Sequence, residues 1–208
     1  MNILLAHGSS DSRHAAEALA LAEAAAEKLG EAIEVHYLDT ESVPDGSRIL
    51  PLLLGDGWHA VNDITRLSKA SACTMLPSLS DRASSIATMA GDLAENALSG
   101  DINTVFALYH FRGFEAVAAE LKGLESRFSR ISLAAMYSAP NVGEALSQWY
   151  DEDVKNIVVQ PLALFEGRTM EKVRRIVAES GGNAEVGPTL ASHKDFSAFI
   201  ADCFRESK

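Results

Sequence analysis

The chain has 208 residues, 47% of them hydrophobic, and a formal net charge of −11 at pH 7. This hydrophobic content is enough for one large or two small globular cores. The negative charge argues against sequence-independent nucleic-acid binding, which needs lysine and arginine to neutralise phosphates. The longest apolar runs fall far short of the roughly 20 residues that cross a bilayer, so no membrane span is expected.

Cysteine content and the first residues bear on the cellular compartment. Cys73 and Cys203 are the two cysteines, and they lie far apart with no CxxC spacing. Neither a disulfide framework nor a thiolate metal site is therefore predicted. The opening "MNILLAHG" has no basic region, long apolar core or small-residue cleavage site of the kind found in secretory signals. We therefore expect a cytoplasmic protein.

The first predicted elements alternate between strand and helix. An apolar run at 2–6 leads into "HGSSDSR", whose serine and aspartate oxygens are suited to capping a helix that begins near Arg13. The alanine-rich and leucine-rich segment that follows ends at Gly30, as expected just beyond a helix. The segments 33–38 and 48–54 are strand-like. This order favours a mainly parallel α/β sheet.

The second half of the chain repeats the pattern of the first. "ILLAH", which ends at His7, matches "FALYH", which ends at His110, and "LPLLLGDG" around Pro51 matches "QPLALFEG" around Pro161. A third pair, 76–93 and 187–204, follows in the same order. Three matches in one order indicate a duplication.

The two halves differ in one predicted helix. The segment 138–161 contains "NVGEALSQWYDEDV", which favours a helix, whereas 39–51 contains only "DTESVPDGSRILP". The first half is therefore expected to lack this crossover helix. We predict two α/β lobes at about 1–100 and 101–208, each a mainly parallel sheet flanked by helices, with a cleft between them.

Two histidines follow predicted strands of the first half. Ligands of open α/β sheets bind beyond the carboxyl ends of the strands, and both His7 and His59 lie there. By itself His7 is read more simply as part of a capped turn. Together with Asp39, which follows a third strand, the two imidazoles suit a divalent transition metal with open coordination positions.

Other readings of these segments have less support. Asp63 lies four residues after His59 and could face the same side, although a solvated first-turn carboxylate explains it at least as well. Ser9 near His7 suggests a nucleophile and its base, but the chain has no GxSxG elbow. Neither GxGxxG nor a P-loop is present, so nucleotide binding has no positive support, and no organic cofactor is expected.

The two histidine segments resemble the signatures of a known family. "LLAHGSSDSR" looks like the first-strand motif of the CbiX and SirB type sirohydrochlorin chelatases, and "ILPLLLGDGWHAVNDI" resembles their second signature. The resemblance covers nearly the whole chain, because the family's long form is a duplicated pair of flavodoxin-like lobes. It implies that the strand at 48–54 delivers His59 to a metal-insertion cleft.

The resemblance also assigns roles to individual residues. The family's two histidines fall on His7 and His59, and its acidic residue falls on Asp39, where the family usually has glutamate. Ser10 stands where an arginine is common. In the second lobe Arg168 occupies the place of His59, so this lobe is expected to lack the metal. There His110, Arg112 and Arg168 are expected to bind substrate, and Arg48 and Arg66 are further candidates for its carboxylates.

The implied function is insertion of a divalent metal into sirohydrochlorin, a flat tetrapyrrole ringed by carboxylates. Cobalt is the first choice of metal, with ferrous iron or nickel as alternatives, and the ion is a substrate. The expected partner is this small molecule, and neither nucleic acid nor membrane is expected to bind. The chain is expected to be a monomer, with a homodimer as the alternative. The alternative is a chelatase-like metal or tetrapyrrole carrier that does not catalyse.

Overall fold

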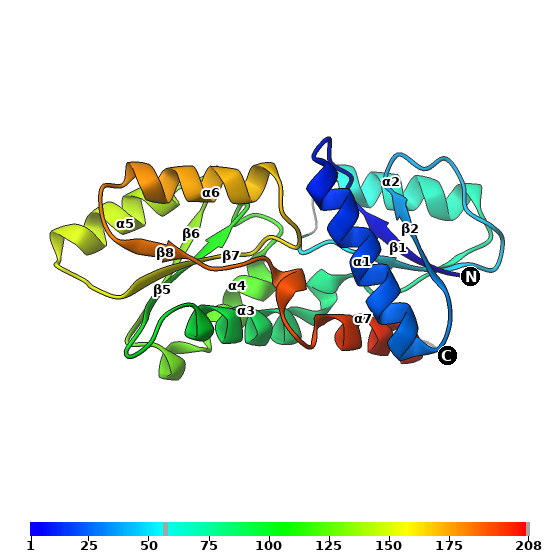
Figure 1. Cartoon of the computed structure of the whole chain (residues 1–208). Coiled ribbons are helices and arrows are strands. Elements are labelled where there is room, and N and C mark those ends of the chain that lie inside the picture. Colours follow the sequence, from blue (N-terminus) through cyan, green and yellow to red (C-terminus); the bar gives the residue numbers. More distant parts are fainter. Residues whose placement is uncertain (56–57, 207–208) are drawn as a thin grey trace. The chain divides into compact units, whose positions relative to one another are not determined.

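The computed structural model describes residues 1–55 and 58–206, and of residues 58–61 it describes the backbone alone (Figure 1). The chain divides into two compact units. One comprises Met1–Arg82 and Lys194–Lys208, and the other comprises Ala83–His193. Each unit has its own sheet, and the two are described separately below.

The first unit is built on a parallel sheet of four strands in the order β2-β1-β3-β4. The strands are β1 (Asn2–Ala6), β2 (Ile33–Tyr37), β3 (Arg48–Pro51) and β4 (Thr74–Met75). The helices are α1 (Ser12–Leu29), α2 (Trp58–Ala70), the short 3-10 helix η1 (Leu79–Arg82) and α7 (Phe196–Arg205). Every residue of β1 is buried, as expected for a central parallel strand with both faces covered.

Local sequence signals set the limits of α1. The Asp11 carboxylate accepts a hydrogen bond from the backbone N–H of Arg13 and so caps the helix. Gly30 has a φ of 77°, a left-handed conformation that glycine adopts without a Cβ clash, and its N–H donates to the Ala26 carbonyl at 2.8 Å. The predicted helix near Arg13 to Gly30 is therefore confirmed.

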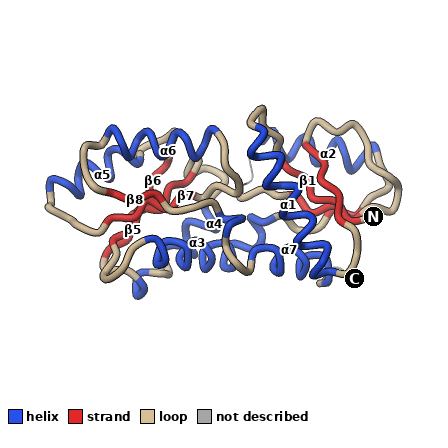
Figure 2. Tube along the Cα trace, viewed as in Figure 1, coloured by secondary structure: helices blue, strands red, loops and turns tan. Residues whose placement is uncertain are grey.

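The second unit has the same strand order, β6-β5-β7-β8, again fully parallel. Its strands are β5 (Asn103–Leu108), β6 (Arg130–Ala135), β7 (Ile157–Pro161) and β8 (Ala184–Val186). Its helices are α3 (Ala83–Ala97), α4 (Glu115–Lys122), α5 (Val142–Asp151) and α6 (Arg168–Glu179), with 3-10 helices η2 (Glu125–Arg127) and η3 (Leu190–Ser192). In Figure 2, α5 and α6 cover one face of this sheet and α3 the other.

A fully buried tryptophan anchors α5 in the second unit. Asn141 and Glu144 form a capping box at the start of this helix. Trp149, 2% exposed, packs in a cluster with residues of the strands and of α6. The first unit has no helix between β2 and β3, within a loop that the structure describes completely. The predicted loss of one crossover helix from the first half is thus confirmed.

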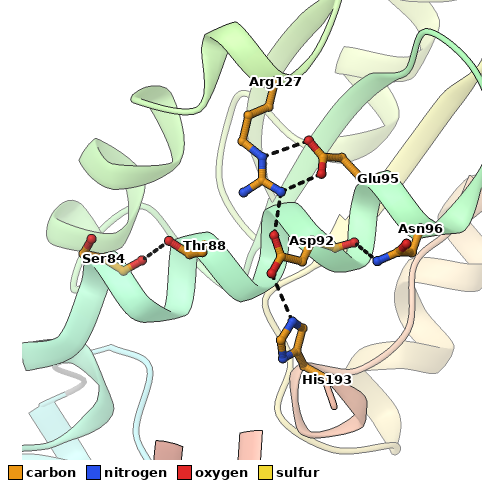
Figure 3. A network of polar contacts seen from close by, with 7 residues as sticks. All are labelled: Ser84, Thr88, Asp92, Glu95, Asn96, Arg127 and His193. Carbon is orange, nitrogen blue, oxygen red and sulfur yellow. Dashed lines mark hydrogen bonds and ion pairs between the residues drawn. The ribbon is translucent and has the colours of Figure 1, made fainter. Parts of the chain in front are cut away.

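A polar network joins α3 to neighbouring segments of the second unit (Figure 3). The Arg127 guanidinium donates to both oxygens of Glu95, at 2.8 and 2.7 Å, and to Asp92 at 2.6 Å. The other oxygen of Asp92 lies 3.2 Å from Nε2 of the buried His193. These contacts tie α3 to η2 and to the segment after η3.

The structure confirms two α/β lobes, each a four-stranded parallel sheet flanked by helices. The unit bounds differ from a division at about residue 100, because the last helix of each sequence half belongs to the other unit. Helix α3 packs against β7, and α7 packs against α1 and β3. These are the helices aligned by the internal repeat. No helix in the described part of the chain is long and apolar enough to span a membrane.

Candidate functional site

His7 follows β1 directly at the carboxyl edge of the first sheet and is exposed. Its Nδ1 lies 3.4 Å from the carbonyl oxygen of Gly8. Gly8 has a φ of 85°, a conformation that favours glycine, and a Cβ there would lie 3.6 Å from the Tyr37 ring. With Nδ1 directed to the backbone, Nε2 remains for a ligand, and no described residue forms a hydrogen bond with it.

Asp39 lies beside His7 at the same edge. The backbone N–H of Leu38 donates to the Ala6 carbonyl at 3.1 Å, so the residues that precede Asp39 and His7 are paired. Asp39 is exposed on the turn that follows. Arg66 of α2 holds this turn by donating to the carbonyls of Leu38 and Thr40 at 2.8 and 3.1 Å. The sheet and this arginine therefore fix the backbone on both sides of Asp39.

The third expected ligand, His59, has its backbone in the first turn of α2, which follows β3. Its side chain is not described, and the same holds for the other side chains of residues 58–61. Among the side chains that the structure does describe, no group of three His, Cys, Asp or Glu residues is placed to hold a metal ion. The convergence of His7, His59 and Asp39 on one ion therefore stays a prediction.

A further histidine, to which the sequence assigned no chemistry, lies near His7. His14 is half-buried in the first turn of α1. Burial lowers the pKa of His14, and the nearby His7 charge lowers it further, so the two imidazoles are close in space. The seven-residue spacing across a glycine turn is the only sequence signal of this pairing. His14 is therefore a half-buried imidazole near the candidate ligand.

The arginines proposed for substrate carboxylates are engaged elsewhere in the first unit. Arg48 lies at the amino edge of the sheet, where it donates to the Asn2 side chain and to the Phe204 carbonyl at 2.9 Å. This placement does not favour Arg48 as a partner of substrate carboxylates, because β3 carries it at the end opposite His7. Arg66 is occupied by the Asp39 turn, and Asp63 is 3.8 Å from it as an ion-pair partner. Asp63 is thus a solvated helix carboxylate.

The carboxyl edge of the second sheet carries aromatic side chains. Tyr109 directly follows β5, in the position that His7 has after β1, and His110 is the next residue. The His110 ring centroid lies 5.1 Å from that of Tyr109 and 5.5 Å from that of Tyr137. The two tyrosine rings are 4.7 Å apart. Burial raises the pKa of the Tyr109 hydroxyl, and the nearby Tyr137 hydroxyl raises it further through its charge and a hydrogen bond. We call Tyr109, His110 and Tyr137 the aromatic cluster.

One cationic group contacts the aromatic cluster. The Lys172 ammonium of α6 lies 3.2 Å from the centroid of the Tyr137 ring. Arg168 is the first residue of α6 and is exposed, as is Arg112 in the loop after β5. Tyr109, Tyr137 and Lys172 were not identified from the sequence. Their one available signal is that each tyrosine comes just after a strand, where sheet ligands bind.

The chain was compared with protein families and with solved structures. The CbiX family model matches residues 1–76 and 110–207. Among solved structures, the CbiX described as the terminal enzyme for biosynthesis of siroheme in denitrifying bacteria is 19% identical with a TM-score of 0.75, and the match covers 100% of this chain and 99% of that one. SirB from Bacillus subtilis, described with Fe3+, is 15% identical with a TM-score of 0.72, at 99% and 94% coverage.

A third solved structure, a multi-domain protein from Deinococcus radiodurans described as similar to chelatases, is 14% identical with a TM-score of 0.73. The match covers 100% of this chain and 55% of that one, whose description includes two additional domains. No curated protein matches the chain in sequence. The structural matches concern the fold, and the family model covers both histidine motifs. The chain belongs to the CbiX family, the sirohydrochlorin chelatases of the CbiX and SirB type, in its two-lobe form.

Proposed function

We propose that the chain inserts a divalent metal ion, cobalt as the first candidate, into sirohydrochlorin. The observation that carries this proposal is that His7 and Asp39 directly follow two paired residues, Ala6 and Leu38, at the carboxyl edge of the first sheet, within the stretch matched by the family model. Both side chains are exposed and so accessible to an incoming ion. In this proposal the N-terminal lobe carries the metal site, and the C-terminal lobe binds substrate without metal.

The proposed chemistry follows from the donor set. Two neutral imidazoles and a carboxylate bind first-row divalent ions and leave coordination positions open for the ring nitrogens. Metal entry displaces the two central pyrrole N–H protons, which leave as the metal–nitrogen bonds form. His7, His59 and Asp39 hold the ion, and an imidazole that releases it then accepts a proton.

The metal is a separate question from the reaction. One structural relative is described as an enzyme of siroheme biosynthesis, and another is described with Fe3+. These descriptions favour ferrous iron as the second candidate. Imidazole and carboxylate ligands accept several divalent ions, so selectivity depends on geometry and on metal supply. The experiment below therefore compares the two metals side by side.

The test follows the absorbance change of metal-free sirohydrochlorin with Co2+ or Fe2+ under anaerobic conditions, corrected for spontaneous insertion. We expect His7→Ala and His59→Ala each to lower kcat at least ~100-fold, in line with loss of acid–base and metal-holding groups. Asp39→Asn should lower it ~10-fold, and Asp39→Glu, which restores the family's usual residue, should retain activity. His36→Ala is the matched control, because His36 pairs with Glu34 on β2.

Two results would contradict the proposal. Activity that survives in His7→Ala and His59→Ala would remove these histidines from the reaction. Stoichiometric binding of metal or tetrapyrrole by the unaltered chain, with no faster conversion than in buffer, would instead identify a carrier.

A further inference from the structure

We propose that Tyr109, Tyr137 and Lys172 form a docking surface for the tetrapyrrole in the second unit, where the tyrosines stack on the ring and the ammonium binds a peripheral carboxylate. This inference rests on the proposed function and adds residues to it. It also makes the second lobe a substrate-holding part with its own binding chemistry.

The exposure of the two tyrosines is unusual for this chain. Tyr109 is 44% exposed and Tyr137 is 49% exposed, and among the described residues the other large hydrophobic side chains so exposed are Met1 and Leu19. The tyrosines follow adjacent parallel strands, β5 and β6, and with His110 their rings lie within 4.7 to 5.5 Å of one another. Three neighbouring rings at the ligand-binding edge of a sheet form an aromatic surface rather than scattered exposed residues.

Positive charge on α6 lies beside this surface. Arg168, Lys172 and Arg175 are spaced i, i+4 and i+7, which places them on one side of the helix. The Lys172 ammonium lies over the Tyr137 ring and has no carboxylate partner among the described residues. Burial lowers the pKa of Lys172, and the nearby Arg175 charge lowers it further. By contrast, Arg174 on the neighbouring position forms a two-armed ion pair with Glu166.

These features match the chemistry of one ligand. A flat conjugated ring offers a face to tyrosine and histidine rings, and carboxylates on its rim offer partners to lysine and arginine. The chain as a whole carries a net charge of −11, so positive charge beside exposed aromatic rings is a local exception that attracts an anion. An apolar ligand would gain nothing from Lys172, and a small anion would gain nothing from the tyrosines.

The experiment is an equilibrium titration of the full-length chain with metal-free sirohydrochlorin, followed by its absorbance shift. Tyr109→Leu and Tyr137→Leu remove a stacking face, and we expect each to raise Kd roughly 10-fold, the scale of one base stacked on an aromatic residue. Lys172→Met keeps the side-chain length and removes the charge, and it should raise Kd roughly 5-fold with a reduced dependence on salt. Tyr137→Phe keeps the ring and should bind as the unaltered chain does.

Controls separate docking from folding and from catalysis. Lys122→Met on α4 removes an exposed lysine of the same unit, and Leu19→Ala removes an exposed apolar side chain of α1; neither should change Kd. Each variant must keep the circular dichroism spectrum and Tm of the unaltered chain. For the tyrosine variants, we expect a raised KM with a nearly unchanged kcat.

The outcomes distinguish this inference from the proposed function. If the unaltered chain inserts metal while the tyrosine and lysine variants bind the ring with unchanged Kd, the docking surface is wrong and the function stands. If the chain binds sirohydrochlorin through these residues and never accelerates insertion, the function fails and the docking surface stands. Equal weakening in Tyr137→Phe and Tyr137→Leu would show that stacking is not the interaction.

Discussion

Arg66 donates a 2.8 Å hydrogen bond to the carbonyl oxygen of Leu38, the residue that precedes Asp39. A second bond reaches the carbonyl of Thr40, so one guanidinium holds the backbone on both sides of the candidate metal ligand. The loop between β2 and β3 has no helix to support it, unlike the loop that contains α5 in the second unit. Arg66 therefore acts in this loop as a positioning residue for Asp39.

The first prediction is that Arg66→Met lowers kcat/KM for metal insertion about 10-fold, the lower end of the effect of removing supports around metal ligands. The affinity for Co2+, measured by titration of the chain without tetrapyrrole, should fall in parallel. Lys69→Met, which removes an exposed lysine of the same helix, is the control. Unchanged metal affinity in Arg66→Met would mean that the turn keeps its shape without the arginine, or that Asp39 is not a ligand.

The second prediction concerns the dependence of stability on pH through the network of Figure 3. Burial of Asp92 opposes its ionisation, but hydrogen bonds from Arg127 and His193 outweigh burial and hold the pKa of Asp92 below its ordinary value of 3.8. The carboxylate thus stabilises the fold fully above this value, and the contribution is lost as pH falls through the lowered pKa. The side chain of Asp92 is 36% exposed, so solvent reduces the effect.

Asp92→Asn should accordingly lower the free energy of unfolding by about 1 kcal/mol at pH 7, within the range for a hydrogen bond to a charged group. The difference from the unaltered chain should shrink as pH falls below 4, and urea unfolding at pH 7 and at pH 3 measures it. Asp151→Asn, at an exposed position on α5, supplies the control. A difference that stays constant from pH 7 to pH 3 would rule out the charge of Asp92 as its source.

The third prediction distinguishes the two cysteines. Burial raises the pKa of the Cys203 thiol to about 11, and its side chain on α7 is fully buried. The thiolate is the reactive form, and at pH 8 it makes up about one part in a thousand of such a thiol. Cys73 is only half-buried. Alkylation with iodoacetamide at pH 8 should therefore modify one thiol in the folded chain and two after unfolding in urea.

Mass spectrometry identifies the modified residue, and Cys73→Ser should leave almost no reaction in the folded chain. Rapid labelling of Cys203 under native conditions would show that α7 separates readily from the first unit. The same measurement thus reports whether the terminal helix stays packed on α1 and β3.

Much of the fold could be predicted from local patterns. The alternation of strand and helix, the caps of α1 and the absence of a helix between β2 and β3 are short-range properties of the chain, and the structure confirms them. The exchange of α3 and α7 between units could not be predicted in this way. Both helices have apolar faces suited to a sheet, and the sequence does not say which sheet each one covers.

Some features of the candidate site could likewise be predicted from the sequence, and others depend on the tertiary structure. The strand-end positions of His7 and Asp39 follow from the sequence, because parallel strands bring their carboxyl ends to one edge. The commitment of Arg48 to the opposite edge, and the meeting of Tyr109, Tyr137 and Lys172 from β5, β6 and α6, depend on register and helix rotation. A sequence by itself determines which residues end each strand, but contacts between distant elements arise only when the core packs and fixes their relative positions.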